Sequence, residues 1–174
     1  MVTIPGEPRP DTTGLRIEAV GYTHPDAARL IAEVQQEYVR RYGSHDASPV
    51  DPGEFDPPRG LFVVAYRGAE PVGTGAWRER RLAVLGVAEA PGACVEVKRM
   101  YVAPGARGLG VARRVLAHLE ATAAAAGASV IVLETGTAQP EAIALYTSSG
   151  YVPVPGFGHY RDSPLSRCFG KRLG

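Results

Sequence analysis

The stretch Val95–Arg113, VEVKRMYVAPGARGLGVAR, decides how the rest of the chain is interpreted. Its first part is rich in Val, Met and Tyr, which favour a β-strand, and Pro104 and Gly105 end that strand. Apolar residues then recur at helical spacing from Val111 to Leu119. The stretch therefore predicts a strand, a glycine-rich turn and the beginning of a helix.

The turn between this strand and this helix has the chemistry of a phosphate-binding site. A helix N-terminus carries unpaired backbone N–H groups and the positive end of the helix dipole. Gly108 and Gly110 have no Cβ, so an anion can approach the backbone closely, and Arg107 adds a guanidinium that can bind phosphate oxygens in pairs. The sequence therefore predicts a phosphate-bearing ligand here, most simply a pyrophosphate.

Three classes of ligand compete for this turn. A nucleoside triphosphate would require G-x-x-x-x-G-K-[S/T], and no glycine of the chain is followed by Lys and then Ser or Thr. A dinucleotide would require G-x-G-x-x-G, but Arg113 occupies the third glycine position, although Glu134 could imitate the acid that binds ribose. Coenzyme A is the third class.

Two motifs favour coenzyme A. The hexad Arg107–Ala112, RGLGVA, resembles the [Q/R]-x-x-G-x-[G/A] pattern of the GNAT superfamily of acyl-CoA-dependent N-acetyltransferases. The run Ala142–Tyr151 resembles that family's A-I-x-L-Y-x-x-x-G-[Y/F] pattern. With strands and helices in the matching order over residues 95–154, the two motifs together are specific for a GNAT cofactor-binding core.

The resemblance implies acetyl-CoA as co-substrate, with no metal, and assigns residues to it. In the GNAT fold the fourth and fifth strands splay apart, and the pantetheine arm pairs with the backbone of the fourth strand, here Met100 and Val102. Many members have Asn where this chain has Gln139. The residues implied for cofactor binding are Met100, Val102, Arg107, Gly108, Leu109, Gly110, Val111, Ala112 and Gln139.

The patterns and the resemblance predict one α/β (α+β) domain over residues 1–174, with residues 1–13 as a loose lead-in. We expect a mixed, mostly antiparallel twisted sheet of about seven strands, with a splayed parallel central pair and about four helices on both faces. A first helix should begin at Pro25, capped by Thr23 or His24, and end at Gly43. Within residues 78–93, the stretch LAVLGV could lengthen a hairpin between the third and fourth strands, and EAPGA signals a turn.

Acetyl transfer needs a base for the amine and a donor for the departing thiolate. By the resemblance, Tyr146 lies beside the sulfur and donates to it. Glu96, on the strand that leads to the pantetheine site, is the candidate base, directly or through a water, or else pairs with Lys98 or an Arg. Glu134 is expected to be structural, and Cys94, on the same side of its strand as Glu96, offers a remote acyl-cysteine alternative.

The composition argues against several other classes of protein. The formal net charge is +1 with no run of Lys and Arg, which disfavours nucleic acid, and no apolar run approaches the roughly 20 residues of a membrane span. The two cysteines and four histidines have no metal-binding spacing. No signal peptide is apparent, and the abundance of Ala, Gly, Pro and Arg suggests a bacterial source, so we expect a cytoplasmic monomer or homodimer.

We therefore expect an N-acetyltransferase that transfers acetyl from acetyl-CoA to a primary amine of a small molecule or peptide, by direct attack in a ternary complex. A non-catalytic acyl-CoA-binding or regulatory module is the alternative, and a nicotinamide-dependent oxidoreductase is the third reading. The acidic loop 44–59 predicts a small cationic amine as acceptor over an acidic one, although Arg78, Arg80 and Arg81 argue for an acceptor that bears a carboxylate. The acidic residues of that loop are Asp46, Asp51, Glu54 and Asp56.

Overall fold

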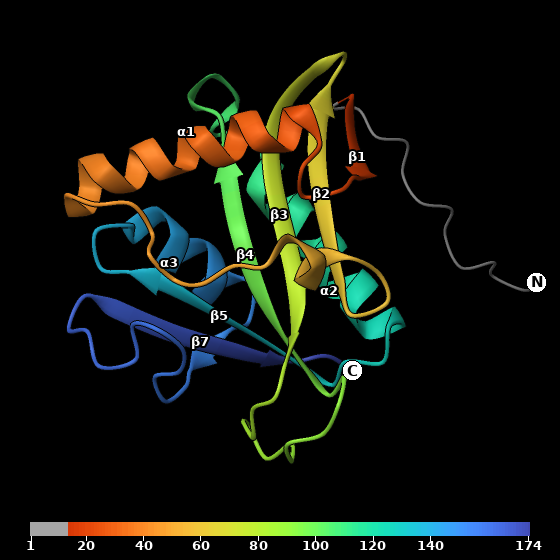
Figure 1. The fold of residues 1–174 in the computed structure, drawn as a ribbon, viewed down its shortest axis with the longest axis vertical. Helices are drawn as coiled ribbons and strands as arrows, with labels where there is room; N and C mark the ends of the chain where they lie inside the picture. Colours follow the sequence, from red (N-terminus) through yellow and green to blue (C-terminus); the bar gives the residue numbers. More distant parts are fainter. Residues whose placement is uncertain (1–13) are drawn as a thin grey trace, which may run out of the picture.

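The computed structural model describes residues 14–174, and the expected lead-in, residues 1–13, lies outside them. Seven strands form one sheet in the order β1-β2-β3-β4-β5-β7-β6, and only the pair β4–β5 is parallel (Figure 1). The expected fold class is thereby confirmed. The strands are β1 (Leu15–Ala19), β2 (Gly60–Arg67), β3 (Glu70–Arg80), β4 (Cys94–Val102), β5 (Val130–Gly136), β6 (Val152–Pro153) and β7 (Ser166–Arg172).

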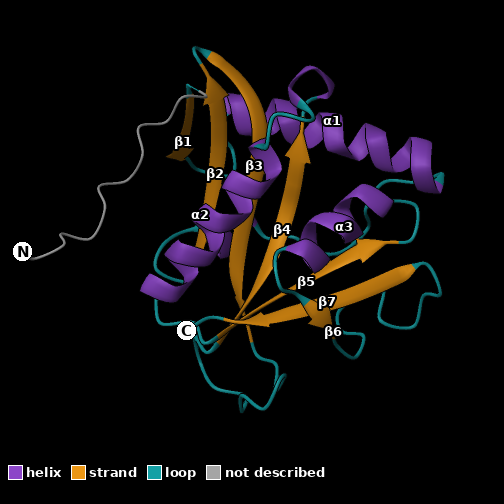
Figure 2. Cartoon of the chain, turned by 180° about the vertical axis from the view of Figure 1, so that it is seen from behind, coloured by secondary structure: helices purple, strands orange, loops and turns teal. Residues whose placement is uncertain are grey.

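Helices cover both faces of the sheet. Helix α1 (Pro25–Tyr42) lies on one face, and α2 (Val111–Ala125) and α3 (Pro140–Ser148) lie on the other (Figure 2). Residues 14–174 thus contain three α-helices, where about four helices were expected. They also contain two short 3₁₀ helices, η1 (Pro52–Phe55) and η2 (Pro104–Ala106). None of these helices is long and apolar enough to cross a membrane.

The ends of α1 follow the sequence signals. The His24 side chain accepts a hydrogen bond from the backbone N–H of Asp26, and Pro25 occupies the first turn. Gly43 ends the helix with φ 80°, and its N–H binds the carbonyl of Val39. The predicted bounds of this helix are therefore confirmed.

Strands β4 and β5 separate halfway along their length. They pair from Cys94↔Val130 to Val97↔Leu133 and no further, although β4 continues to Val102. Next to the point of separation Arg99 has φ 57°, and its carbonyl accepts a hydrogen bond from Thr74 Oγ1 at 2.7 Å. This irregularity in the ladder between β3 and β4 bends β4 away from β5.

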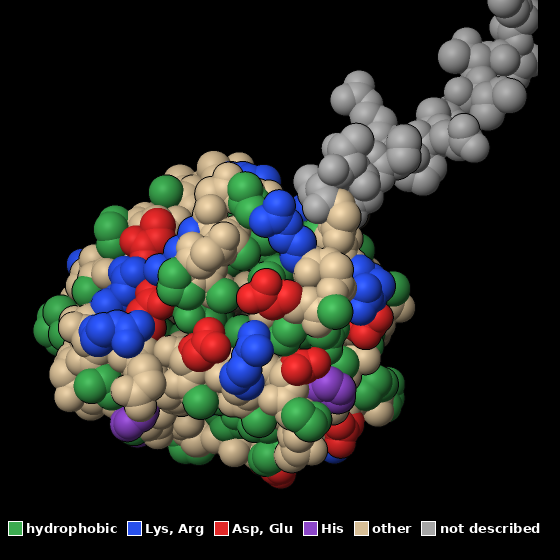
Figure 3. All heavy atoms as spheres, turned by 90° about the horizontal axis from the view of Figure 1, so that it is seen from above, with side chains coloured by type: hydrophobic (Ala, Val, Ile, Leu, Met, Phe, Trp, Pro, Cys, Tyr) green, Lys and Arg blue, Asp and Glu red, His purple; other side chains and the backbone are tan. Residues whose placement is uncertain are grey.

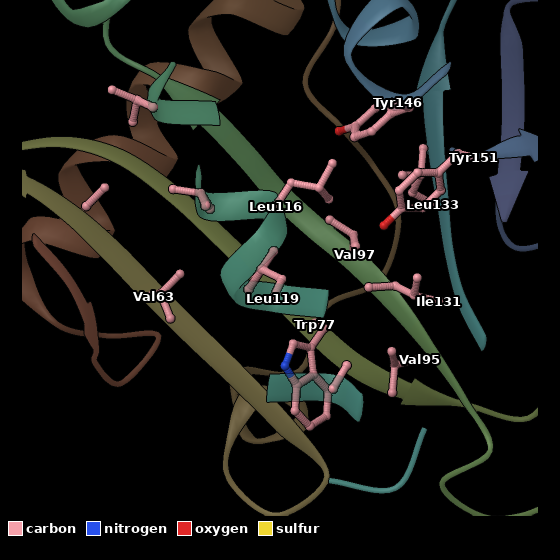
Figure 4. Close-up of a cluster of buried hydrophobic side chains, with 14 of the residues drawn as sticks. Val63, Trp77, Val95, Val97, Leu116, Leu119, Ile131, Leu133, Tyr146 and Tyr151 are labelled. Carbon is pink, nitrogen blue, oxygen red and sulfur yellow. The ribbon is translucent and has the colours of Figure 1, made fainter. Parts of the chain in front are cut away.

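Two apolar cores hold the layers together. Under α2 and α3, the side chains of Trp77, Val95, Val97 and Ile131 pack with Leu116 and Leu119 of α2 (Figure 4). Under α1, the buried residues are Ala27, Leu30, Val34, Phe55, Phe62, Val64, Tyr66, Ala76 and Tyr101. Phe55 stacks on Tyr22 with a centroid distance of 5.3 Å, and thereby anchors the loop 44–59 to the fold.

Residues 81–93 do not lengthen the hairpin between β3 and β4. Leu85 and Gly86 both have positive φ, and they form a small turn closed by the bridge Val84↔Val87. The apolar side chains of this segment pack on a third cluster that includes Cys94 and Phe157. Burial of these side chains therefore determines the conformation of the segment, in place of strand pairing.

Candidate active site

A cavity of about 730 Å³ lies where β4 and β5 separate. Its walls come from α1, β4, the turn before α2, β5, α3 and the loop that precedes β7. The volume is in the range of pockets that bind cofactors and substrates. Figure 3 shows the molecule from above, relative to Figure 1. Acidic and basic side chains are intermixed on this face, in keeping with the formal net charge of +1.

One end of this cavity is the turn before α2. Gly108 and Gly110 have φ of 79° and 78°, a left-handed conformation that favours glycine. Helix α2 begins at Val111, and no side chain caps its first N–H groups. Arg107 contributes its guanidinium, which contacts Glu37 and donates through Nε to the carbonyl of Val102 at 3.0 Å. These groups suit a pyrophosphate, so the residues present fit coenzyme A.

Eight of the nine residues assigned to the cofactor line this cavity, as does Tyr146. Leu109 is the exception, because its side chain is 48% exposed and takes no part in the lining. It stands between two glycines of left-handed conformation, which turn its side chain away from the cavity. The residues that line the cavity are Met100, Val102, Arg107, Gly108, Gly110, Val111, Ala112 and Gln139.

The C-terminal half of α1 is joined to the beginning of α3 beside this cavity. Arg41 pairs with Glu37 at 2.8 Å and with Glu141, and it donates to the carbonyl of Ala138 at 2.7 Å. The hydroxyl of Tyr42 donates to Oε1 of Gln139 at 3.2 Å. We call these contacts the α1–α3 bridge. They occupy the side-chain carbonyl of Gln139 and leave its NH₂ group for a ligand.

Tyr146, the predicted donor to the thiolate, lines the cavity. Its side chain is buried and contacts the ring of Tyr151 at 5.8 Å, and Figure 4 shows it near Leu133. Burial raises the pKa of Tyr146 above its ordinary value, and the nearby Tyr38 adds to this. The phenol therefore keeps its proton at neutral pH and can act only as a donor or as a neutral acceptor.

Glu96 lies outside the cavity lining, and the structure gives it the alternative role of an ion-pair partner. Its buried carboxylate receives Nε of Arg78 at 3.1 Å and lies 3.4 Å from Nε of Arg80. Arg78 also contacts Glu54 at 2.6 Å. Because two guanidinium groups already occupy this carboxylate, the ion-pair alternative is favoured, and the role of base at Glu96 stays a prediction.

Glu134 takes the position in the cavity that was predicted for Glu96. It is the residue after the last one of β5 that pairs with β4, and its half-buried carboxylate lines the cavity. Burial raises the pKa of Glu134 to about 7; Lys98 and Ser166 oppose the rise, and Glu96 and Asp46 add to it. Its strand position relative to Glu96 was visible in the sequence, but the neighbours that distinguish the two carboxylates were not.

The loops after α1 and before β7 meet on the side of Glu134. The hydroxyl of Tyr160 accepts the N–H of Ala47 at 2.7 Å, and both Tyr160 and the neighbouring Asp46 line the cavity. Nη1 of Arg99 donates to Asp46 at 2.9 Å. Burial alone would raise the pKa of Asp46, but Lys98, Ser48 and Arg99 lower it to about 2.

The acidic loop is therefore less available for steering a cation than the sequence suggested. Asp46 binds Arg99, Glu54 binds Arg78, and Asp51 accepts the N–H of Gly53 at the beginning of η1. These contacts neutralise or occupy most of its carboxylates. The expectation of a cationic acceptor consequently loses its basis.

The remaining nucleophile and metal candidates have no place at this site. Cys94 is buried among apolar side chains and does not line the cavity, and burial raises the pKa of its thiol to about 11. That environment does not suit an acyl-cysteine relay. In the part of the chain that the structure describes, no three His, Cys, Asp or Glu side chains are grouped to hold a metal ion.

Known proteins of similar sequence and fold include acetyltransferases. Residues 27–151 match the model of the acetyltransferase (GNAT) family. An IAA acetyltransferase of Azospirillum brasilense is 37% identical over 145 residues, which cover 83% of this chain and 89% of that protein.

Solved structures agree with this assignment. A Klebsiella pneumoniae structure described as an acyl-CoA N-acyltransferase has a TM-score of 0.72 at 29% identity, covering 94% of this chain and all of that one. An IAA acetyltransferase from Bacillus cereus has the same fold, with a TM-score of 0.62 at 20% identity and coverages of 91% and 99%.

The family match and the shared fold thus define an acyl-CoA-dependent acyltransferase. The chain belongs to the GNAT family and is an N-acetyltransferase that uses acetyl-CoA and an amine acceptor.

Proposed function

We propose that this enzyme acetylates the primary amine of a small molecule by direct attack on acetyl-CoA, with Glu134 as base and Tyr146 as donor to the leaving sulfur. The observation that carries the proposal is one continuous cavity. It contains the phosphate-binding turn at Arg107–Ala112, the unpaired edge of β4, Tyr146 and Glu134. The two bound substrates would therefore meet without an intermediate carrier.

Glu134 suits the base because its pKa of about 7 lies near neutral pH. An ammonium substrate gives one proton to the Glu134 carboxylate and becomes a nucleophile. The C–N bond then forms as the thioester carbonyl opens, and the C–S bond breaks when the carbonyl re-forms. The nitrogen loses its second proton in this step, so that the overall reaction releases one proton besides forming the amide and the thiol.

Tyr146 suits the other end of the reaction. Its buried hydroxyl keeps its proton, and a phenol donor would stabilise or protonate a thiolate as the C–S bond breaks. Backbone groups of β4 at Met100 and Val102 have no partner on β5, so they can pair with the amides of the pantetheine arm, although the Val102 carbonyl already accepts Nε of Arg107. Arg107 and the first N–H groups of α2 would bind the pyrophosphate.

The test is free-thiol release from acetyl-CoA with a panel of primary amines, and separately with IAA because two similar proteins are named for it. Calorimetric titration of coenzyme A should be run in parallel. Turnover with at least one amine is expected, with both substrates required for product. Tight coenzyme A binding without turnover of any amine would identify a binding module instead.

A further inference from the structure

We propose that the acceptor is a small amine that also carries a carboxylate, of the amino-acid type, and that Lys98 binds this carboxylate while Glu134 receives the proton of the ammonium. The inference rests on the proposed function and specifies the substrate class of the same site. It comes from the positions of Lys98 and Glu134 and from the charges around them.

Lys98 and Glu134 are equivalent residues of adjacent parallel strands. The last paired residues are Val97 and Leu133, so Lys98 and Glu134 are the first residues beyond them, where the cavity begins. Parallel neighbours are about 5 Å apart, and residues at equivalent positions point to the same face. Both side chains line the cavity, which sets a cation and a carboxylate side by side at its inner end.

The charges nearby leave Lys98 only partly compensated. Asp46 is the other carboxylate within reach, with Oδ2 at 2.9 Å from Arg99 and 3.7 Å from Nζ of Lys98. Asp46 also accepts the N–H and the hydroxyl of Ser48. The Asp46 carboxylate is thus shared between the two cations Lys98 and Arg99. Lys98 donates to Oγ of Ser48 at 3.1 Å, so its ammonium has further donors for an anion.

An acceptor with two opposite charges matches this arrangement. With Glu134 ionised, the inner end holds Asp46 and Glu134 against Lys98 and Arg99, and the pair Asp46–Arg99 is already satisfied. What remains is one carboxylate and one ammonium. A zwitterion can satisfy both, whereas a polyamine would place a second cation beside Lys98 at a cost in free energy.

The groups that border this part of the cavity suit a small acceptor. The Tyr160–Ala47 hydrogen bond joins the two loops that border it, and Ser163 and Ser166 add hydroxyl groups to the lining. These neutral groups can bind the remaining polar atoms of a compact amino acid. Lys98 and Glu134 follow directly on the last residues that pair β4 with β5, which favours α- and β-amino acids, whose charged groups are only a few bonds apart.

The experiment compares amino acids with their carboxamides, which keep the amine and lose the negative charge. We expect kcat/KM to be at least about tenfold higher for the best amino acid than for its amide, in line with the loss of one charge-assisted contact. Lys98→Met should lower kcat/KM for the amino acid by about 10–100-fold, chiefly by raising KM. It should change kcat/KM for the carboxamide by less than about threefold. Lys98→Arg should restore part of the loss.

The matched control is Lys171→Met, at the only other lysine of the chain, which pairs with Glu120 and does not line the cavity. Melting temperature and acetyl-CoA binding of each variant show that it is folded. Equal use of acids and amides, or equal losses for both in Lys98→Met, would overturn the proposal. Absence of turnover with every amine would instead count against the proposed function, so the two failures are distinguishable.

Discussion

The hydroxyl of Tyr160 lies 2.7 Å from the backbone nitrogen of Ala47 and accepts its hydrogen bond. Tyr160 belongs to the loop before β7 and Ala47 to the loop after α1, which are 113 residues apart in sequence. Both loops border the end of the cavity that contains Glu134. This contact therefore closes the acceptor side of the site from two distant parts of the chain.

Tyr160→Phe should weaken acceptor binding and leave the cofactor side unchanged. The substitution removes one hydrogen bond, which is worth about 0.5–1.5 kcal/mol, so KM for the amine should rise about 2–10-fold. Initial rates at varied amine and at varied acetyl-CoA measure the two sides separately. An unchanged KM for the amine would mean that the loops stay in place without this contact.

Gly110→Asp should weaken coenzyme A binding by about 10–100-fold. A residue with a Cβ is strained at φ 78°, and its carboxylate would repel a pyrophosphate at the N-terminus of α2. Gly68→Asp is the control for strain alone, because Gly68 has φ 62°, has open space around it and lies outside the cavity. Calorimetric titration gives both affinities, and similar affinities in the two variants would contradict this assignment of the turn.

Tyr146→Phe should lower turnover by about 10–1000-fold, since it removes the donor to the leaving sulfur and keeps the ring. Binding of acetyl-CoA should change little. Tyr151→Phe is the matched control, because this tyrosine packs against Tyr146 but does not line the cavity. Comparable losses in both variants, under conditions where chemistry limits the rate, would point to packing as the cause.

Glu134→Gln should remove a titrating step near pH 7 from the rate profile. The base must be ionised, and burial raises the pKa of Glu134 to about 7, so the parent should lose activity as the pH falls through that value. The ratio of variant to parent rates across pH isolates this step, because the titration of the amine is common to both. Glu96→Gln should retain the step, and its loss there would return the base to Glu96.

Glu134 should also affect stability, with a sign set by its raised pKa. The folded protein holds this proton more tightly than the unfolded chain, whose carboxyl has its ordinary pKa near 4.5. The stabilising contribution is complete below about pH 4.5 and is lost as the pH rises through about 7. Glu134→Gln should therefore gain in Tm relative to the parent at pH 8, by about 2–4 °C for each 1 kcal/mol, and the gain should be smaller at pH 5.

The parts of the site that local sequence determines were predictable. The turn at Arg107–Ala112 and the tyrosine of α3 are fixed by glycine positions and by helical spacing within short motifs. The division of roles between Glu96 and Glu134 was not predictable, since both are carboxylates on strands and their neighbours come from other elements. Arg78 and Arg80 reach Glu96 from β3, and only the register between the strands reveals this contact.

The role of the acidic loop 44–59 could not be predicted from the sequence for the same reason. Its composition was visible, but the partners of Asp46 and Glu54 are arginines of β4 and β3, at 53 and 24 residues' distance in sequence. A carboxylate counted from composition is available to a ligand only if no such partner reaches it. Long-range contacts, rather than the number of charges, therefore determine what this loop can attract.

The separation of β4 from β5 has a consequence for the solubility of the protein. Beyond Val97 and Leu133 each strand has an edge without a partner strand, and such edges are templates for pairing between chains and for aggregation. Here the edges lie inside a cavity, with the Arg41–Glu141 contact of the α1–α3 bridge beside it. A slender arm with a few amides can reach them more readily than a second strand with side chains on both faces, so the open edges are more accessible to a small ligand than to other copies of the chain.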